Sequence, residues 1–393
     1  MKTPMKVLKK VLGMLAGAAL GYGGISLITW MVDGGMSSPE SPSGETGYGL
    51  WLPLGLAMLW LFVCFFIHLV LHEAGHLIMG LATGFRFLSF RVFNLTLVKT
   101  DEGLRWKRFH IAGTGGQCIM DLPESQDLRT APWFWYNAGG VLMNILLTVA
   151  GIVVLRLSNP AVVAYTFFMM LAFVGLFMAI TNGVPMMVGG IGNDGHNIRS
   201  MWRHPEDRRL FARSFQMAGQ MSRGKRMGEM PPEWFEDIPV DGKSRFLEIS
   251  YRMSYMALLE DRMQPDKARE VAEEVMALGK KLPQLLRLEV GGERVMLELM
   301  TSNRREVVEG LWDNQLARYT ERNGKYSPMK NAVLYAYELL YKNDEERAKT
   351  YKQRLESHEH EYTMPGETRT ALAVIDFIGN ARLCHRCGGD AGD

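Results

Sequence analysis

The feature that most limits how this chain can fold is a long uncharged run in its first quarter. Residues Gly49–Leu71 contain no Lys, Arg, Asp or Glu and a single His, at position 68. A helix of that length can cross a bilayer, where the backbone polar groups have to be satisfied within the helix itself. The run therefore predicts a transmembrane helix.

Three further apolar runs, Val11–Val32, Ala131–Leu157 and Ala161–Ile180, extend this pattern. The first follows four lysines and is either a signal peptide or a retained helix; its length and the absence of a clear cleavage site favour retention. The next segment, Asp33–Tyr48, contains no Lys or Arg, so the positive-inside rule places it outside and the N-terminus in the cytoplasm. These runs predict a predominantly α-helical, polytopic membrane bundle of about four transmembrane helices, with residues 1–48 forming the first helix and an outer loop.

Composition limits the remaining possibilities. The 393 residues are 47% hydrophobic, with the apolar runs before residue 200 and most of the charge after it. A net charge of +2 is too small to argue for a nucleic-acid partner. With only four Cys, one of them inside an expected membrane helix, no disulfide framework is indicated.

The second apolar run leads directly into a His-Glu-x-x-His motif formed by His72, Glu73 and His76. Helical residues four positions apart share a face, so both imidazoles can bind one zinc ion, and the Glu can serve as the base that activates a water. A catalytic zinc takes three protein ligands. Asp194 is the candidate for the third, because it follows a Gly-rich loop and is the only carboxylate in Gly175–Ser200. The competing interpretation is a buried His pair with an unrelated Asp.

A metalloprotease motif at the end of a membrane helix, followed by Asn182-Gly183-Val184-Pro185 and Asp194-Gly195, resembles the site-2 protease family of intramembrane zinc metalloproteases. The resemblance covers roughly residues 50–200 and implies Zn²⁺ on His72, His76 and Asp194. In that family a small-residue segment followed by an Asn contributes a polar side chain to the active site, which here implies Asn144. Gly140 stands where the family commonly has Pro, and the spacer Met186–Asn193 is longer than usual.

Four further polar side chains are candidates around this centre. Asn144 and Asn182 are expected to bind the substrate backbone or the developing oxyanion. His68 lies four residues before His72, too far along the helix to share an ion with His76, and is either a buried hydrogen-bonding residue or a proton relay. His196 either orients Asp194 or lies solvated in its loop.

Residues 84–118 read as a β-hairpin, from a β-rich run at Phe87–Val98 and a return strand at Leu104–Ile111. Its basic residues place it on the cytoplasmic side. Two interpretations remain open: a hairpin lying on the lipid headgroups, or an edge strand that holds an extended substrate.

The polar half begins with a juxtamembrane linker at residues 201–242 and continues as a cytoplasmic α-helical domain at residues 243–383. Five amphipathic helices are expected there: Phe246–Asp261, Asp266–Lys281, Arg304–Thr320, Met329–Lys342 and Asp344–His358. The domain is either a stabilising cap or a module that binds a cytoplasmic partner. Residues 384–393, with Cys384 and Cys387, are expected to be a disordered tail.

The sequence thus predicts a zinc-dependent intramembrane endopeptidase in the cell membrane, with both termini cytoplasmic and the active site towards the cytoplasmic leaflet. The expected partners are membrane lipids, a transmembrane protein or peptide as substrate, and a cytoplasmic partner of the helical domain. One alternative is a non-catalytic membrane assembly or maturation factor. Another is a metal transporter, which would need further ligands along a path that the membrane half does not offer beyond His68.

Overall fold

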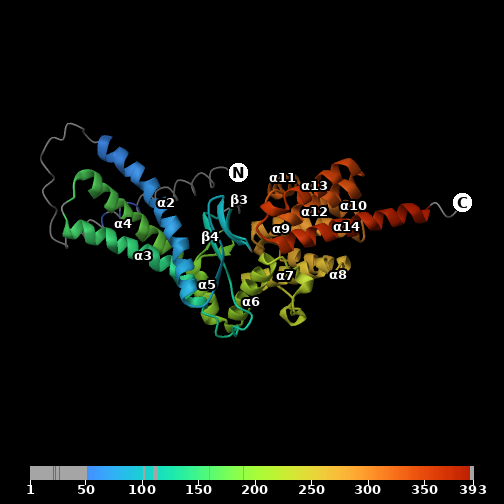
Figure 1. The fold of residues 1–393 in the computed structure, drawn as a ribbon, viewed down its shortest axis with the longest axis horizontal. Coiled ribbons are helices and arrows are strands. Elements are labelled where there is room, and N and C mark those ends of the chain that lie inside the picture. The colour runs from blue at the N-terminus through green and yellow to red at the C-terminus, as the bar shows by residue number, and fades with distance from the viewer. Residues whose placement is uncertain are drawn as a thin grey trace, which may run out of the picture. The chain divides into compact units, whose positions relative to one another are not determined.

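The computed structural model describes residues 51–100, 102–108, 114–158, 160–188 and 190–389, together with residues 21, 23 and 26. The first expected transmembrane helix, Val11–Val32, lies outside the described residues apart from those three positions. The chain is mostly helical and divides into two compact units (Figure 1). Among described residues, the first contains the chain as far as Met79, Trp135–Met186 and Asn193–His196, and the second contains the remainder.

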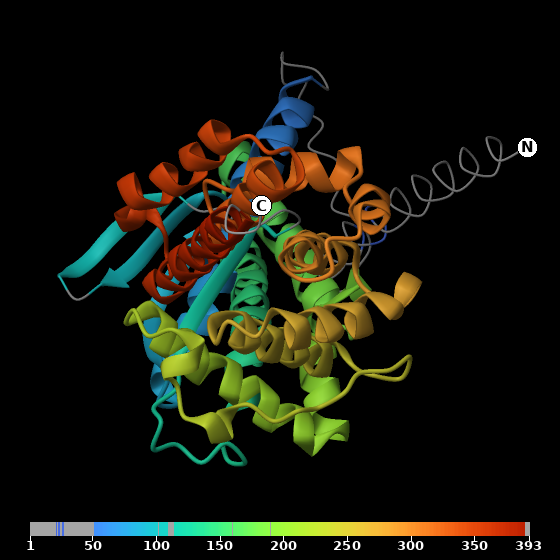
Figure 2. The ribbon, with the colours of Figure 1, turned by 90° about the vertical axis from the view of Figure 1, so that its right-hand side faces the viewer.

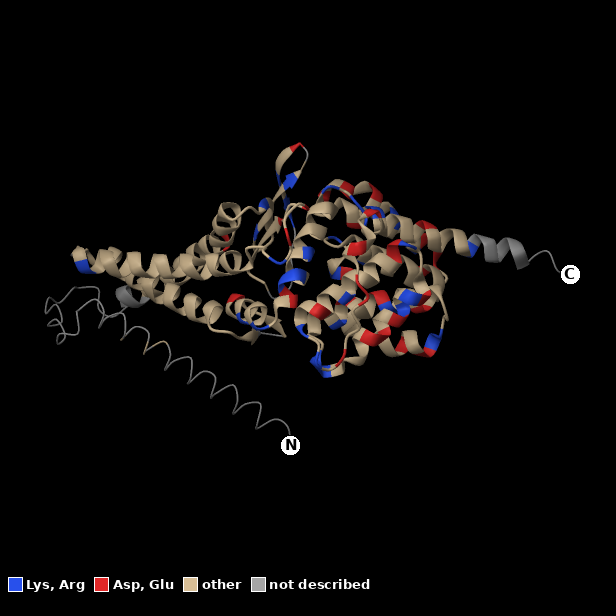
Figure 3. Ribbon diagram, turned by 90° about the horizontal axis from the view of Figure 1, so that it is seen from below, with Lys and Arg blue, Asp and Glu red and all other residues tan. Residues whose placement is uncertain are grey.

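The first unit is built on three long apolar helices, α2 (Trp51–Ala82), α3 (Trp133–Leu157) and α4 (Val162–Gly183). Each is long and apolar enough to cross a membrane, and almost no charged residue interrupts them (Figure 3). The chain is therefore consistent with a membrane protein that has three such helices in the described region. The expected count of four depends on residues outside that region.

These helices pack through small clusters and leave large apolar side chains facing outward. Leu155 of α3 packs with Met169 and Ala172 of α4, while Cys64 of α2 packs with Leu171 and other residues of α4. By contrast, large outward side chains are strongly exposed: Phe62 69%, Leu146 61% and Phe177 52%. Contiguous apolar exposure of this kind is expected where lipid, rather than water, surrounds a helix.

The second unit begins with a four-stranded antiparallel sheet rather than the single hairpin expected at residues 84–118. Its strands are β1 (Arg86–Val92), β2 (Leu95–Thr100), β3 (Gly103–Arg108) and β4 (Gly116–Asp121), in the order β3-β2-β1-β4. The expected single run Phe87–Val98 is in fact two strands. Phe93, at φ 54°, forms with Asn94 a two-residue turn that pairs Val92 with Leu95. No Gly or Pro marks that turn, which is why the sequence pattern concealed it.

Helices also fill much of the segment expected to be a linker. After the short strands β5 (Met187–Val188) and β6 (Ile191–Gly192) come α5 (Asp194–Arg203) and α6 (Pro205–Ser222). The 3-10 turns η1 (Met227–Glu229) and η2 (Pro232–Trp234) follow. Helix α6 packs against strand β4 of the sheet. Arg223, the residue that follows α6, forms an ion pair with β4, in which its Nη1 lies 2.8 Å from Asp121 Oδ2.

The remaining helices pack against one another and complete this unit; they are coloured from yellow to red in Figure 2. They are α7 (Phe246–Asp261), α8 (Pro265–Ala277), η3 (Gly279–Lys281), α9 (Gln284–Met300), α10 (Arg305–Leu311), α11 (Asn314–Asn323), α12 (Pro328–Ala336), the π-helical η4 (Tyr337–Tyr341), α13 (Glu345–Ser357), η5 (Glu359–Glu361) and α14 (Pro365–Gly389). The expected helix Arg304–Thr320 is divided, because Asp313 caps α11 by accepting hydrogen bonds from the backbone amides of Gln315 and Leu316. Helix α9 was not predicted. Helix α14 continues through Cys384 and Cys387 to Gly389, into the stretch where the sequence predicts a disordered tail from residue 384.

A cluster of charged side chains is buried between these helices. Lys330 of α12 is 1% exposed, and its Nζ lies 2.5 Å from Glu289 Oε2 and 3.9 Å from Glu293 Oε1 of α9. Burial raises the pKa of Glu293 to about 7, although the nearby ammonium opposes the shift. Burial also raises the pKa of Glu260 and that of Glu367.

Candidate metal centre

The two imidazoles of the His-Glu-x-x-His motif meet on one face of α2. His72 and His76 are each 6% exposed, and their Nε2 atoms lie 3.2 Å apart. The spacing of four residues on an unbroken helix brings this about, as the sequence predicted. Two Nε2 atoms at this separation point towards a common centre.

Asp194 completes the group as the first residue of α5. Its Oδ2 lies 3.2 Å from His72 Nε2 and 3.5 Å from His76 Nε2. A tetrahedral zinc ion with bonds of about 2.0 to 2.1 Å holds its ligand atoms about 3.3 Å apart. Among described residues these three form the group that could hold a metal ion, with their ligand atoms within 4.8 Å of one another.

The Asp194 side chain is 16% exposed, so its carboxylate is largely shielded from water, which suits a metal ligand. Its Oδ2 accepts no well-formed hydrogen bond from any described residue, although both imidazoles lie beside it. Burial opposes ionisation, but His76 and His72 in their protonated forms outweigh it and hold the pKa of this carboxyl well below its usual range. With the two rings neutral, that positive charge has to come from another cation. A buried anion without a bonded proton donor is costly unless a cation compensates it, so the donor set fits a divalent ion.

Asn193, which sequence reasoning missed, fixes Asp194 in place. Its Nδ2 donates to the carbonyl oxygens of Thr181 (2.7 Å) and Val184 (2.6 Å), at the end of α4. Its Oδ1 accepts from the backbone amides of Met186 (3.1 Å) and His196 (2.9 Å). The bond from His196 is an N-cap of α5, and an Asn immediately before a helical Asp-Gly was the available sequence signal. Through these four bonds the end of α4 holds the start of α5.

A backbone carbonyl orients His76. The Nδ1 of His76 lies 2.7 Å from the carbonyl oxygen of Tyr136 on α3. A carbonyl can only accept, so Nδ1 carries the hydrogen and the neutral ring keeps its lone pair on Nε2. That is the tautomer that binds a metal, and a second hydrogen bond of this kind is usual for metal-binding histidines.

A longer chain of polar groups orients His72 in the same way. His68 Nε2 lies 2.8 Å from the carbonyl oxygen of Leu171, so it must donate. A neutral His68, at 0% exposure, then has a bare Nδ1, which has to accept from the amide of Asn144, 3.2 Å away. The other end of that amide, 2.9 Å from His72 Nδ1, is then the oxygen and accepts from Nδ1–H.

The structure records Asn144 Oδ1 beside His68 Nδ1 and Nδ2 beside His72 Nδ1. This assignment exchanges the two amide atoms, so that the NH₂ faces His68 and the oxygen faces His72. The oxygen and nitrogen of an Asn amide are assigned from their partners rather than observed directly. The reverse orientation would require a doubly protonated His68 within an apolar helix, which is expensive. The outcome is a lone pair on His72 Nε2, directed at Asp194 and His76.

The close approach of α2 and α3 depends on glycines. A Cβ on Gly75 would lie 2.2 Å from the carbonyl oxygen of Gly139, so the two backbones touch. A Cβ on Gly140 would lie 2.5 Å from His72 Cε1 and 2.7 Å from His76 Nε2. Any side chain at position 140 would therefore enter the space beside both ligand nitrogens.

The other predicted site residues lie nearby in different roles. Glu73 is buried, at 8% exposure, on the turn of α2 between the two histidines. Asn182 Nδ2 donates to the carbonyl oxygen of Met178 in its own helix, and the backbone amide of His196 donates to Asn193 Oδ1. Asn144, expected to contact substrate, bridges two histidines, and its substrate role stays a prediction. His68 belongs to the hydrogen-bond chain and not to the ligand group.

Comparisons of the chain with protein-family models, with curated proteins and with solved structures give no match. The interpretation of the site therefore rests on its own geometry and on the sequence motifs.

Proposed function

We propose that the protein is an intramembrane zinc endopeptidase that cleaves membrane-bound proteins within or next to their transmembrane segments. The observation that carries the proposal is the convergence of His72, His76 and Asp194 on one centre, with Glu73 in the same helical turn. The resemblance of the motifs to those of site-2 proteases supports the same conclusion, as do the three helices of membrane-spanning length.

The proposed chemistry divides between the metal and the chain. A zinc ion held by the three ligands supplies a Lewis acid that lowers the pKa of a water towards neutrality. Glu73 accepts a proton from the attacking water and delivers it to the amine that leaves when the peptide bond breaks. Asn144 and Tyr136 act as positioning groups, because their hydrogen bonds keep the lone pairs of His72 and His76 on Nε2.

Asn182 is the proposed contact for the substrate backbone. Its Nδ2 donates one hydrogen to Met178 O. The second hydrogen of that amide can donate to a substrate carbonyl or a developing oxyanion, and Oδ1 can accept from a substrate amide. Both the backbone-binding role and the oxyanion role therefore stay open for this residue.

Metal content and proteolysis test the proposal separately. Purified wild-type protein in detergent is expected to contain about one zinc per chain by elemental mass spectrometry. Asp194→Ala should lose most of that zinc, whereas Glu73→Gln should retain it. Cells that express wild-type protein should show new N-termini from membrane proteins, measured by N-terminal proteomics, and cells that express Glu73→Gln should not.

Glu346→Gln is the matched control, because Glu346 is 87% exposed on α13 and far in sequence from the motif. It should behave as wild type in both measurements. New N-termini at wild-type levels with Glu73→Gln would remove the proposed base and contradict the mechanism. Bound zinc without any proteolysis in wild type would instead favour the non-catalytic membrane factor.

A further inference from the structure

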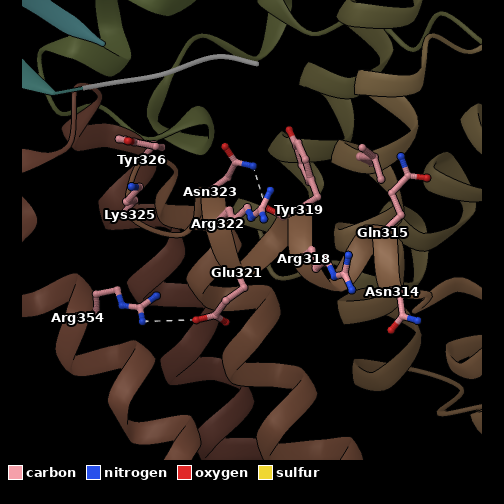
Figure 4. A pocket seen from close by; sticks show the side chains of 11 residues that line it. Asn314, Gln315, Arg318, Tyr319, Glu321, Arg322, Asn323, Lys325, Tyr326 and Arg354 are labelled. Atoms are coloured by element: carbon pink, nitrogen blue, oxygen red, sulfur yellow. Dashed lines mark hydrogen bonds and ion pairs between the residues drawn. The ribbon is translucent and has the colours of Figure 1, made fainter. Parts of the chain in front are cut away.

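The helices of the second unit form a pocket that the proposed proteolysis does not use. It has a volume of about 1140 Å³ and is lined mainly by α11 and the turn that follows it, with Leu288 of α9 and Arg354 of α13. Four cationic side chains line it, Arg318, Arg322, Lys325 and Arg354, against one acidic residue, Glu321 (Figure 4). A recess with this excess of positive charge attracts an anionic ligand.

The two arginines of α11 in this pocket differ from the buried arginines of the unit, because they have no acidic partner among the described residues. Most buried and half-buried arginines nearby are paired; for example, Arg252 bonds Glu274 at 2.6 Å, and Arg294 bonds Glu298 at 2.6 Å. Within the pocket, Arg354 lies 3.8 Å from Glu321. Arg318 and Arg322 are exposed and make no ion pair with any described residue. Their guanidinium groups are therefore free to bind carboxylates in bidentate fashion.

The floor of the pocket is rigid. The hydroxyl of Tyr319 donates to Glu289, which in turn pairs with the buried Lys330. Asn323 Nδ2 donates to the carbonyl oxygen of Tyr319 at 2.8 Å. The ring of Tyr319 is therefore held through its hydroxyl and its backbone through Asn323, so little ordering of this residue is needed when a ligand binds.

We propose that this pocket binds an acidic peptide segment of a partner protein in an extended conformation. Arg318 and Arg322 are one helical turn apart, about 6 Å along the axis. Acidic side chains two residues apart on one face of an extended chain are separated by about 6.7 Å, so two such carboxylates match the two guanidinium groups. The side-chain amides of Asn314 and Gln315, which also line the pocket, supply partners for the peptide backbone.

The shape of the site favours a peptide over the other polyanions. A single chain segment can enter a recess of this size, whereas the plane of lipid headgroups cannot follow its walls. The low net charge of the chain, +2, gives no general attraction for a nucleic-acid backbone. The inference is independent of the proposed proteolysis, because no residue of the metal centre takes part.

Fluorescence anisotropy on the full-length protein in detergent tests the pocket. The probe is a labelled Ser-Glu-Phe-Glu-Ser peptide, compared with Ser-Gln-Phe-Gln-Ser. We expect the acidic peptide to bind between about three- and thirtyfold more tightly, and the joint Arg318→Ala and Arg322→Ala change to remove that difference. The corresponding double change to Lys should restore part of the affinity, since Lys keeps the charge but not the bidentate geometry.

The control replaces Arg262 and Lys280 by Ala, which removes the same charge from exposed positions of the same unit. It should leave peptide affinity unchanged, and a thermal unfolding scan should show that all variants fold. Equal affinity for the Glu and Gln peptides, or equal loss in the control, would overturn the proposal. Stronger binding of a twelve-nucleotide single strand through the same arginines would assign the pocket to nucleic acid instead.

Discussion

Replacing Asn144 tests the hydrogen-bond chain that orients His72. In Asn144→Leu, the Nδ1–H of His72 loses its acceptor, and the ring can adopt the tautomer whose Nε2 carries hydrogen and cannot bind metal. Loss of a hydrogen bond to a metal-binding histidine typically lowers metal affinity 10- to 100-fold, which is about 1.4 to 2.7 kcal/mol. Both His68 and His72 are buried, so each unpaired nitrogen should also lower the free energy of unfolding by about 1 to 3 kcal/mol.

Asn144→Asp separates affinity from stability. A carboxylate can still accept from His72 Nδ1–H, so zinc affinity should stay within about threefold of wild type. It cannot donate to His68 Nδ1, which lies 3.2 Å away, so His68 has to take a proton in an apolar helix, and the thermal transition should fall. The affinity should be measured by competition with a chromogenic chelator.

Asn182→Leu is the control, since the Asn182 side chain bonds only its own helix carbonyl among the described contacts. Wild-type zinc affinity in Asn144→Leu would refute the assignment of the tautomer. Equal loss in Asn182→Leu would show that any polar deletion in this bundle disturbs the site.

Three other expectations follow from the same geometry. Gly140→Ala places a Cβ 2.5 Å from His72 Cε1, so zinc affinity should fall at least about tenfold while the helix content measured by circular dichroism is retained. Unchanged zinc binding would mean that α2 and α3 move apart easily enough to make room for the methyl group. Asn193→Ala removes four hydrogen bonds at the start of α5 and should lower the free energy of unfolding by about 2 to 4 kcal/mol and weaken zinc binding. An unaltered zinc titration would show that Asp194 does not need these bonds to hold its position. Burial raises the pKa of Glu293 to about 7, so the folded chain holds a proton there that the unfolded chain loses above about pH 4.5, and Glu293 should lower the unfolding free energy by up to about 3 kcal/mol between pH 4.5 and 7. Glu293→Gln should reduce the pH slope in urea titrations, with Glu260 and Glu367 contributing the remainder in the same direction, and an unchanged slope would exclude Glu293 as one of its sources.

The ligand group was the most predictable part of the site. Two histidines four residues apart on a helix meet by geometry alone, and Asp194 was the only carboxylate in the segment expected on the same side of the membrane. The positioning residues were harder to identify. Asn144 bridges histidines that lie 72 and 76 residues away in the chain. A contact between residues so far apart cannot be predicted from the periodicity of a local segment.

The fold was predictable where the chain has a strong period or a long apolar run. α7 begins and ends at the residues expected, Phe246 and Asp261, and the apolar runs after residue 50 form helices of membrane-spanning length. The sheet was underestimated because its first turn uses Phe93 at positive φ, a conformation that a bulky residue adopts only when its surroundings impose it. The residues next to Phe93 in the sequence do not predict that constraint.

The site solves a problem that a single helix cannot solve. Two ligands come from consecutive turns of α2 at no further conformational cost, but a helix offers no third ligand at the correct angle to both. The third therefore has to come from another segment, and a carboxylate brought beside two imidazoles in a buried space needs to be held there before any cation arrives. The bonds of Asn193 to the end of α4 provide that restraint, and the carbonyl of Tyr136 provides it for His76. These bonds lie within the protein and restrain the two side chains in addition to any bound ion, and the Asn193 prediction measures how much of the metal affinity depends on them.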